Sequence, residues 1–433
     1  MKKAITFLII IILFSSCRKE DPVPEVTPAM ARDSLYYLMK ELYYWYDKMP
    51  SVNRENYADP YELLEALRYR PLDRWSYVAD YNATVSQLQG SFVGHGIRIG
   101  LDEAGIARIA MIYNNSPLYA SGVRRGWIVK NINGFNIADI LLRNDTAKYS
   151  QALGPSKEGV TNSFLFSPPG QADVTISSTK TAFKIKTVLL YDTIHLSTGS
   201  VTGHLVLSSF IEPTENELKT AFAFFKANNV KDFILDLRYN SGGYLDLGQK
   251  LASYIGGSSL TGSVFSRLLY NDKNENENTT YPFVATLYPL AVKKLVVITS
   301  RSTASASEAV INGLYTKITV VSVGDTTEGK PVGMNIWPCG KKYYFWPITF
   351  KTVNSLNQGD YFEGLPPDRR AVDDITHDFD NRNEACLKEA ILYLETGQFS
   401  GKGDGLFRRS NHFNETPSLI NNTFIRNKIR PER

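Results

Sequence analysis

The spacing of apolar side chains changes twice along the chain, and each change marks a boundary between expected domains. Between residues 29 and 89, apolar residues recur every three or four positions, which is the spacing of a buried helix face. The first series consists of Leu35, Leu38, Met39, Leu42 and Trp45, and the second of Leu63, Leu64 and Leu67. The pattern therefore predicts an N-terminal helical module over residues 29–89.

Short apolar runs separated by glycines replace the helical pattern from residue 90 to about residue 181. The runs cover residues 94–100, 107–112 and 126–129. Runs of this length with turn residues between them are typical of β-strands. This stretch therefore predicts a small β domain over residues 90–181.

Apolar runs alternate with helix-like segments from residue 182 to residue 397, as expected of an α/β layered domain. The runs at 205–207, 233–235, 295–298 and 319–321 are the expected strands of its sheet. Residues 398–433 are rich in glycine, asparagine and charged residues, and we expect a mobile tail there. The predicted fold class is a multidomain α/β protein.

Composition and charge exclude several function classes. Of the 433 residues, 43% are hydrophobic and 21% are charged, as in ordinary globular proteins. A net charge of +4 is small for this length and gives no reason to expect nucleic acid as a partner. The five histidines show no paired ligand spacing, so we expect no metal and no other cofactor.

The N-terminus has the features of a targeting segment. A basic start at Lys2 is followed by the apolar run 7–14, which is too short to span a bilayer as a mature helix. Ser15 and Ser16 precede Cys17, and the segment resembles a bacterial lipoprotein signal in which Cys17 becomes acylated. The resemblance implies a signal over 1–17, a tether over 18–28 and a lipid anchor, which we expect in the outer membrane. An ordinary secretory signal is the alternative.

Two further cysteines remain once Cys17 is assigned to the signal. Cys339 and Cys386 can form one disulfide in an oxidising envelope, or they can be isolated buried thiols. The sequence leaves both possibilities open.

The strongest candidate for chemistry is a serine between an apolar run and a helix-like segment. Ser305 follows the run 294–299, and Lys330 follows a second β-rich run, 318–323. Two parallel strands joined by a helix end at the same edge of a sheet, so Ser305 and Lys330 can meet there. A buried, neutral lysine can take the proton of a serine hydroxyl. The alternatives are a serine that only caps the helix and a solvated lysine.

An acyl-transfer site also needs backbone N–H groups that face the developing negative charge. The N–H of Ala306 is one candidate, and that of Gly242 or Gly243 in the turn 240–243 is the other. His204 is a possible rival base, although a partly buried strand residue is the expectation for it.

Four blocks of this chain resemble the signature blocks of the S41 carboxy-terminal processing peptidases. They cover residues 236–243, 303–308, 329–330 and 364–368, and the resemblance extends over about residues 30–395. It implies a core of the ClpP/crotonase-like layered type, with Ser305 as nucleophile and Lys330 as general base. It also implies that Ala306 and either Gly242 or Gly243 form the oxyanion hole.

The chain departs from this family at Met334, where many members carry a glutamine that orients the lysine. Methionine cannot make that hydrogen bond, and the neighbouring Asn335 is the candidate substitute.

The β domain resembles a PDZ domain, in which a glycine-flanked strand edge receives a peptide C-terminus. The resemblance implies a peptide-binding edge, and a generic small β domain is the alternative. The residues expected there are Val93, Gly94, His95, Gly96 and Ile97.

The sequence therefore predicts a serine endopeptidase of the bacterial envelope that cleaves protein substrates, with the PDZ-like domain binding or gating the chain. A catalytically weak peptide-binding or ligand-binding lipoprotein with the same fold is the main alternative. A structural lipoprotein that uses the PDZ-like domain as an adaptor is the third. The physiological substrate and the oligomeric state stay open.

Overall fold

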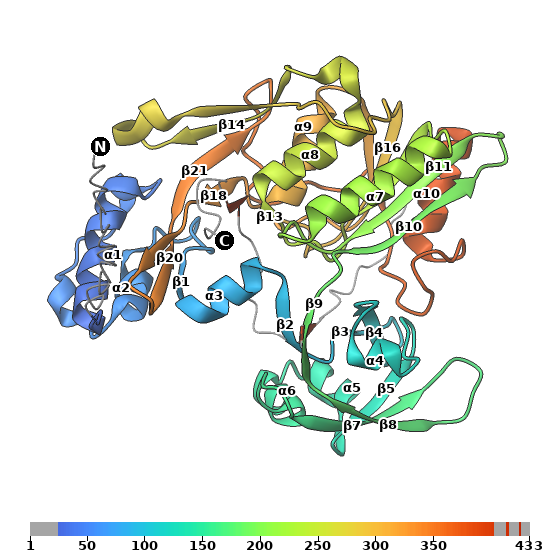
Figure 1. The fold of residues 1–433 in the computed structure, drawn as a ribbon, viewed down its shortest axis with the longest axis horizontal. Helices are drawn as coiled ribbons and strands as arrows, with labels where there is room; N and C mark the ends of the chain where they lie inside the picture. Colours follow the sequence, from blue (N-terminus) through green and yellow to red (C-terminus); the bar gives the residue numbers. More distant parts are fainter. Residues whose placement is uncertain (1–24, 402–412, 415–423, 426–433) are drawn as a thin grey trace, which may run out of the picture.

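The computed structural model describes residues 25–401 together with 413–414 and 424–425 (Figure 1). The expected lipidation residue Cys17 and most of the expected tail, 398–433, lie outside these described residues. No helix in the described part of the chain is long and apolar enough to cross a membrane.

The N-terminal region is mainly helical. Thr27 caps the N-terminus of helix α1 (Pro28–Leu42), where its hydroxyl accepts from the Met30 N–H. Asp59 caps α2 (Pro60–Leu67) in the same way. Helix α3 (Tyr81–Leu88) follows β1 (Tyr77–Asp80), a strand that the helical pattern did not predict. Strand β1 pairs antiparallel with β20 (Tyr343–Trp346), so the N-terminal region is joined to the far end of the chain.

The β domain has its own hydrophobic cluster, formed by residues such as Ile99, Ile109 and Phe164. Its strands are β2 (Ser91–Gly94), β3 (Ile97–Leu101), β4 (Ala107–Ile112), β5 (Ile128–Ile132), β6 (Phe135–Asn136), β7 (Thr161–Ser167), β8 (Val174–Thr179) and β9 (Thr181–Lys184). Its helices are α4 (Pro117–Ala120), α5 (Ile137–Leu142) and α6 (Thr146–Leu153). Strand β2 pairs with β9, whereas β3 pairs with β4 and with β23 (Phe413–Asn414).

The central sheet of the remaining region has helices on both faces (Figure 1). Its strands, in spatial order, are β10 (Val188–His195), β11 (Val201–Leu207), β12 (Asp232–Asp236), β16 (Lys294–Thr299), β17 (Thr319–Gly324) and β22 (Arg369–Arg370). All neighbouring pairs are parallel except β10 with β11.

Side chains of the central strands alternate between two hydrophobic clusters, as the pleat requires. Phe233 and Leu295 belong to the cluster that contains α7 (Thr214–Ala227), α8 (Leu245–Gly256) and α9 (Ala306–Tyr315). Ile234 and Val296 pack instead with α10 (Ala385–Thr396). This layered arrangement and the N-terminal helices confirm the predicted fold class.

The same region contains a second six-stranded sheet. Its strands, in spatial order, are β13 (Gly243–Tyr244), β24 (Phe424–Ile425), β18 (Val332–Met334), β21 (Ile348–Val353), β14 (Val264–Tyr270) and β15 (Thr279–Pro282). Although β20 and β21 are consecutive, they have different partners: β20 pairs with β1 and β19 (Trp337–Cys339), while β21 pairs with β14 and β18.

Candidate active site

Ser305 lies at the turn between β16 and α9 in a backbone conformation that side chains rarely adopt. Its φ is +63° and its ψ is −120°, and its side chain is fully buried. Although Ser305 precedes the first residue of α9, its Oγ makes no hydrogen bond with any described residue. Ser305 and Glu308 therefore stand in the capping-box arrangement at the start of α9, while the hydroxyl itself has no hydrogen-bond partner among the described residues.

The turn 240–243 packs directly against Ser305. A Cβ atom on Gly242 would lie 2.7 Å from the Cβ and 3.0 Å from the Oγ of Ser305, so only glycine allows this approach. The Gly242 φ of +103° also favours glycine. The turn is tied to the Ser305 segment because the Asn240 carbonyl accepts from the Ala304 N–H at 3.2 Å and from the Ser307 hydroxyl at 2.9 Å.

The two glycines of this turn differ in their surroundings. The Gly242 N–H donates to the Asn240 Oδ1 at 2.9 Å and is already engaged in this state. Gly243 faces Phe210, whose carbonyl oxygen would lie 2.1 Å from a Cβ at that position. Ala306 is the first residue of α9, and N–H groups of a first helical turn have no partner within the helix. The structure thus brings Ala306 and Gly242 to Ser305.

Buried charges anchor the segment that leads into this turn. The Arg238 guanidinium pairs with Asp236 at 2.6 Å, with Glu384 at 2.7 Å and with Asp373 at 2.9 Å. Arg125 from the β domain also pairs with Asp373, at 2.8 Å. The same network therefore fixes the turn and holds the β domain against the central sheet.

Glu308 joins the Ser305 segment to the Lys330 segment, a role that the sequence reasoning missed. Its fully buried carboxylate accepts from the N–H groups of Ser305 (2.9 Å), Gly329 (2.8 Å) and Lys330 (2.8 Å), and from the Thr327 hydroxyl (2.5 Å). Burial raises its pKa to about 7, against the opposing effect of these donors. Its position three residues after Ser305, which is the capping-box spacing, was the available signal.

Lys330 is fully buried, and burial lowers the pKa of its amine well below the ordinary value. The Nζ lies 5.9 Å from the centroid of the Trp75 ring. Its hydrogen-bond partner is the Met334 Sδ, at 3.8 Å, and no hydrogen bond links it to the Ser305 Oγ in this structure. The amine is therefore in the environment that a neutral lysine requires, although it does not yet contact the serine.

Residues of the N-terminal region complete the surroundings of the lysine. The Trp75 indole donates to the Glu328 carboxylate at 3.4 Å, and the charge of buried Asp73 favours the protonated form of Lys330. No local pattern linked residues 73–75 to Lys330, because the contact spans more than 250 positions of the chain.

Asn335 is not directed at Lys330. Its amide nitrogen donates to the Tyr270 hydroxyl at 3.3 Å, whereas Met334 is the residue against the amine. Neighbouring side chains on an extended backbone point to opposite faces, so Asn335 cannot take the place of the side chain at 334.

The histidines named from the sequence lie in buried structural positions. His204 is buried in β11, where burial lowers its pKa to about 4, and its Nε2 has no hydrogen-bond partner among the described residues. His95 bonds Ser178 at 2.9 Å and Asn162 at 2.7 Å with its two ring nitrogens.

The five residues of the expected peptide-binding edge are divided between two strands. Val93 and Gly94 already pair with β9, and the buried His95 and Gly96 form the break before β3. Only Ile97 belongs to β3, the strand whose outer edge pairs with β23.

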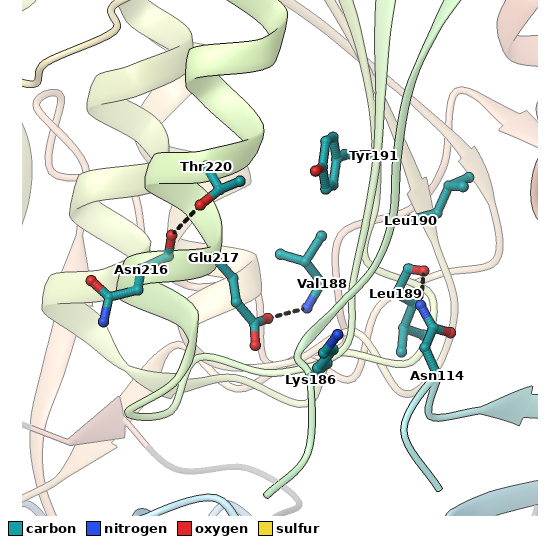
Figure 2. Close-up of a pocket in the computed structure, with 9 residues that line it drawn as sticks. All are labelled: Asn114, Lys186, Val188, Leu189, Leu190, Tyr191, Asn216, Glu217 and Thr220. Carbon is teal, nitrogen blue, oxygen red and sulfur yellow. Dashed lines mark hydrogen bonds between the residues drawn. The ribbon is translucent and has the colours of Figure 1, made fainter. Parts of the chain in front are cut away.

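Other groups add no second site to this picture. Cys339 and Cys386 are both free thiols. Within the described ranges, no three His, Cys, Asp or Glu side chains are arranged to hold a metal ion. A cavity of about 460 Å³ lies between α7 and β10, and it contains none of the candidate residues (Figure 2). Its lining consists of Asn114, Lys186, Val188, Leu189, Leu190, Tyr191, Asn216, Glu217 and Thr220.

Known proteins resemble this chain over most of its described length. The carboxy-terminal processing protease CtpB of Bacillus subtilis is 24% identical over 343 residues, which cover 74% of this chain and 66% of that protein. The carboxyl-terminal-processing protease of a Picosynechococcus species is 24% identical over 285 residues, covering 65% of each chain. The present chain thus spans just under two thirds of these relatives.

A solved structure shares the fold. It belongs to a candidate S41 protease of Bacteroides fragilis, with a TM-score of 0.70, 23% identity, and coverage of 87% of this chain and 99% of that one. Two family models also match, Peptidase family S41 over residues 201–370 and the Peptidase S41 N-terminal domain over residues 31–77. The first match includes Ser305 and Lys330 and the second includes Trp75, so the chain belongs to peptidase family S41.

Proposed function

We propose that this protein is a serine endopeptidase in which Ser305 is the nucleophile and Lys330 the general base. The observation that carries the proposal is a fully buried lysine amine, with a strongly lowered pKa, tied through Glu308 to a strained serine whose hydroxyl has no partner in the described part of the chain. A buried amine whose acceptor is only a weak thioether and a strained serine both cost stability, and such costs are concentrated at functional sites.

The chemistry follows from these groups. The Ser305 Oγ attacks the substrate carbonyl while its proton passes to the neutral Lys330 Nζ. The N–H of Ala306 and that of a glycine in the turn 240–243 stabilise the negative oxygen of the tetrahedral intermediate. Lys330 returns the proton to the leaving amine, and then takes a proton from the water that hydrolyses the acyl-enzyme.

The state described here is a resting state of that reaction. Lys330 Nζ donates to Met334 and the Gly242 N–H donates to Asn240, so both groups have other partners. Substrate binding must move the amine from the weak thioether acceptor to the serine. Gly243 serves as the glycine donor unless Asn240 releases Gly242.

We assign the cellular setting from the sequence of residues 1–17, which supports export and acylation at Cys17. The substrates would then be proteins of the bacterial envelope. The PDZ-like domain would bind or gate the substrate chain, and Arg125 gives it a direct connection to the Arg238 network that fixes the turn 240–243.

Cleavage of an unfolded protein tests the proposal. The chain from residue 18 onward, without lipid, is incubated with reduced, carboxymethylated protein, and fragments are identified by mass spectrometry. We expect cleavage by the parent and none by Ser305→Ala. Equal cleavage by both would exclude Ser305 as the nucleophile, and binding of the unfolded protein without cleavage by either would favour a binding protein of the same fold.

The rate should rise with pH through the lowered pKa of Lys330, because only the neutral amine can accept the serine proton. We expect the rising limb of kcat/KM to lie well below the ordinary lysine value of about 10.4. Initial rates between pH 5 and pH 10 measure it, with circular dichroism at each pH as the control for folding. A rate that begins to rise only near pH 10 would contradict a buried neutral base.

Gly242→Ala should abolish most of the activity, since its Cβ would meet the Ser305 side chain at 2.7–3.0 Å. Displacing an oxyanion donor typically lowers kcat about 10²–10³-fold. The control is Gly262→Ala, which has a similar positive φ of +85° but nothing within 4 Å of the added Cβ. Comparable losses of kcat in the two variants would show that backbone strain alone is responsible.

A further inference from the structure

The C-terminal segment of the chain fills a strand position beside the proposed dyad. Strand β24 (Phe424–Ile425) lies between β13 and β18 and runs parallel to both, with Gly243 opposite Phe424 and Met334 opposite Ile425 (Figure 1). Strand β13 begins one residue after Gly242, and β18 begins two residues after Lys330. The position between them is therefore bordered by the turn that packs on Ser305 and by the segment that carries the lysine.

The same segment also pairs with the β domain. Strand β23 adds to the edge of β3 in antiparallel register, with Phe413 opposite Ile99 and Asn414 opposite Arg98. Addition of a strand to an exposed sheet edge is a general way to bind an extended peptide. One stretch of chain thus occupies two strand positions, first on the β domain and about ten residues later at the dyad.

The presence of β24 between β13 and β18 is consistent with the burial of the proposed dyad. Ser305 and Lys330 are both fully buried, and the serine hydroxyl has no partner among the described residues. Without β24, β13 and β18 would not be bridged, because no direct pairing joins them.

We propose that the gap between β13 and β18 binds substrate as a strand parallel to both, and that the C-terminal segment of this chain is its resident occupant. This inference rests on the proposed peptidase function. The segment competes in cis with protein substrates at the dyad and at the β3 edge together. Its removal opens both positions.

The truncated enzyme is expected to fold, because the four hydrophobic clusters of the described structure consist of residues 26–399. Thermal unfolding checks this point. A full-length alternative is Ile425→Pro, which removes the backbone N–H at the residue that faces both Tyr244 and Met334. Its matched control is Ile425→Val, which keeps the N–H.

Peptide binding is the first measurement, because it does not require activity. A fluorescein-labelled peptide of residues 411–428 is titrated by anisotropy into Ser305→Ala proteins that end at residue 433 or at residue 401. An occupant in cis competes at a high effective concentration, so the full chain should bind the peptide at least about tenfold more weakly than the truncated one. Ile425→Pro should bind like the truncated chain, and Ile425→Val like the full one.

Cleavage then separates this inference from the proposed function. With Ser305 intact, the truncated chain should cleave unfolded protein faster than the full chain, and the peptide should inhibit it. Peptide binding to the truncated chain without cleavage would refute the proposed peptidase activity. It would still support the inference that the C-terminal segment occupies the gap between β13 and β18. Equal peptide binding by the full and truncated chains, or binding by neither, would overturn the inference that the gap between β13 and β18 is a peptide-binding position occupied by the C-terminal segment.

Discussion

Lys330→Met should remove the activity and raise the melting temperature of the protein. Loss of a general base lowers rates by roughly 10²–10⁴-fold. The stability gain follows from the fully buried amine, whose Nζ has the Met334 thioether as its one hydrogen-bond partner among the described residues. Methionine matches lysine in length, is unbranched, and needs no solvation. Differential scanning calorimetry and peptide hydrolysis measure the two effects on one preparation.

The size of the stability effect depends on pH. Burial lowers the pKa of the Lys330 amine in the folded state, so the folded protein releases this proton at a lower pH than the unfolded chain, which binds a proton below about pH 10.4. The unfolded state therefore binds more protons between the two pKa values, and the parent loses stability as the pH falls through that interval. The advantage of Lys330→Met should grow as the pH falls through that interval and should shrink as the pH approaches about 10.

Lys180→Met is the matched control for this substitution. Lys180 is also buried, but its Nζ donates to the carbonyl oxygens of Gly154 (3.2 Å) and Pro155 (3.0 Å) in the β domain. Removing the amine leaves two buried carbonyl acceptors without their donor, so Lys180→Met should lose stability. Its peptide hydrolysis should be unchanged, because Ser305 and Lys330 are unaltered. If Lys330→Met were destabilised like Lys180→Met, the Lys330 amine would have to be charged and paired.

The sequence predicted the positions of Ser305 and Lys330 because both follow apolar runs that could only be neighbouring strands. The runs became β16 and β17, which pair in parallel along their full length. The right-handed connection through α9 then brings both strand ends to one edge. Local pattern was sufficient because the two residues are separated by one strand and one helix.

Contacts over longer separations could not be predicted in this way. The apolar periodicity of residues 29–89 indicates helices, but nothing in it indicates that Trp75 lies against Lys330 or that β1 pairs with β20. The assignment of Asn335 relied on its position next to Met334. It assumed that a small backbone shift could turn Asn335 toward Lys330, although neighbouring side chains of an extended backbone point to opposite faces. Tertiary packing decides such contacts, and the local spacing of apolar residues in the sequence does not reveal them.

Stability and function conflict at several points of this site. Ser305 has a positive φ, Lys330 has a buried amine, and the Ser305 hydroxyl has no hydrogen-bond partner within the ranges that the structure describes. Each feature would be removed by selection for stability alone. Glu308 offsets part of the cost, because its carboxylate satisfies three buried N–H groups and one hydroxyl at the junction of the segments that carry Ser305 and Lys330.

Glu308→Gln should therefore be the most destabilising single-atom change in the site. All four partners of the carboxylate are donors, two on each oxygen, and a glutamine offers only one acceptor oxygen. Two buried donors would face an NH₂ group, at a cost of roughly 1–3 kcal/mol for each one left unpaired. We expect a lower melting temperature together with a fall in kcat, because Ser305 and Lys330 lose their common anchor.

The pH dependence distinguishes this anchoring role from simple loss of fold. The pKa of Glu308 is raised to about 7 from 4.5, so the folded state binds the extra proton between these values and the stability that it contributes is lost as the pH rises through 7. Glu308→Gln removes that dependence, and its deficit should be smaller at pH 8 than at pH 5. Glu389→Gln is the control, because its mostly buried carboxylate on α10 accepts from Arg369 and Ser400 and touches neither Ser305 nor Lys330; it should change neither kcat nor its pH profile. A Glu308→Gln enzyme with unchanged melting temperature and kcat would show that other contacts hold the Ser305 and Lys330 segments together. The first candidate is the hydrogen bond from the Glu328 N–H to the Thr303 carbonyl, at 2.9 Å.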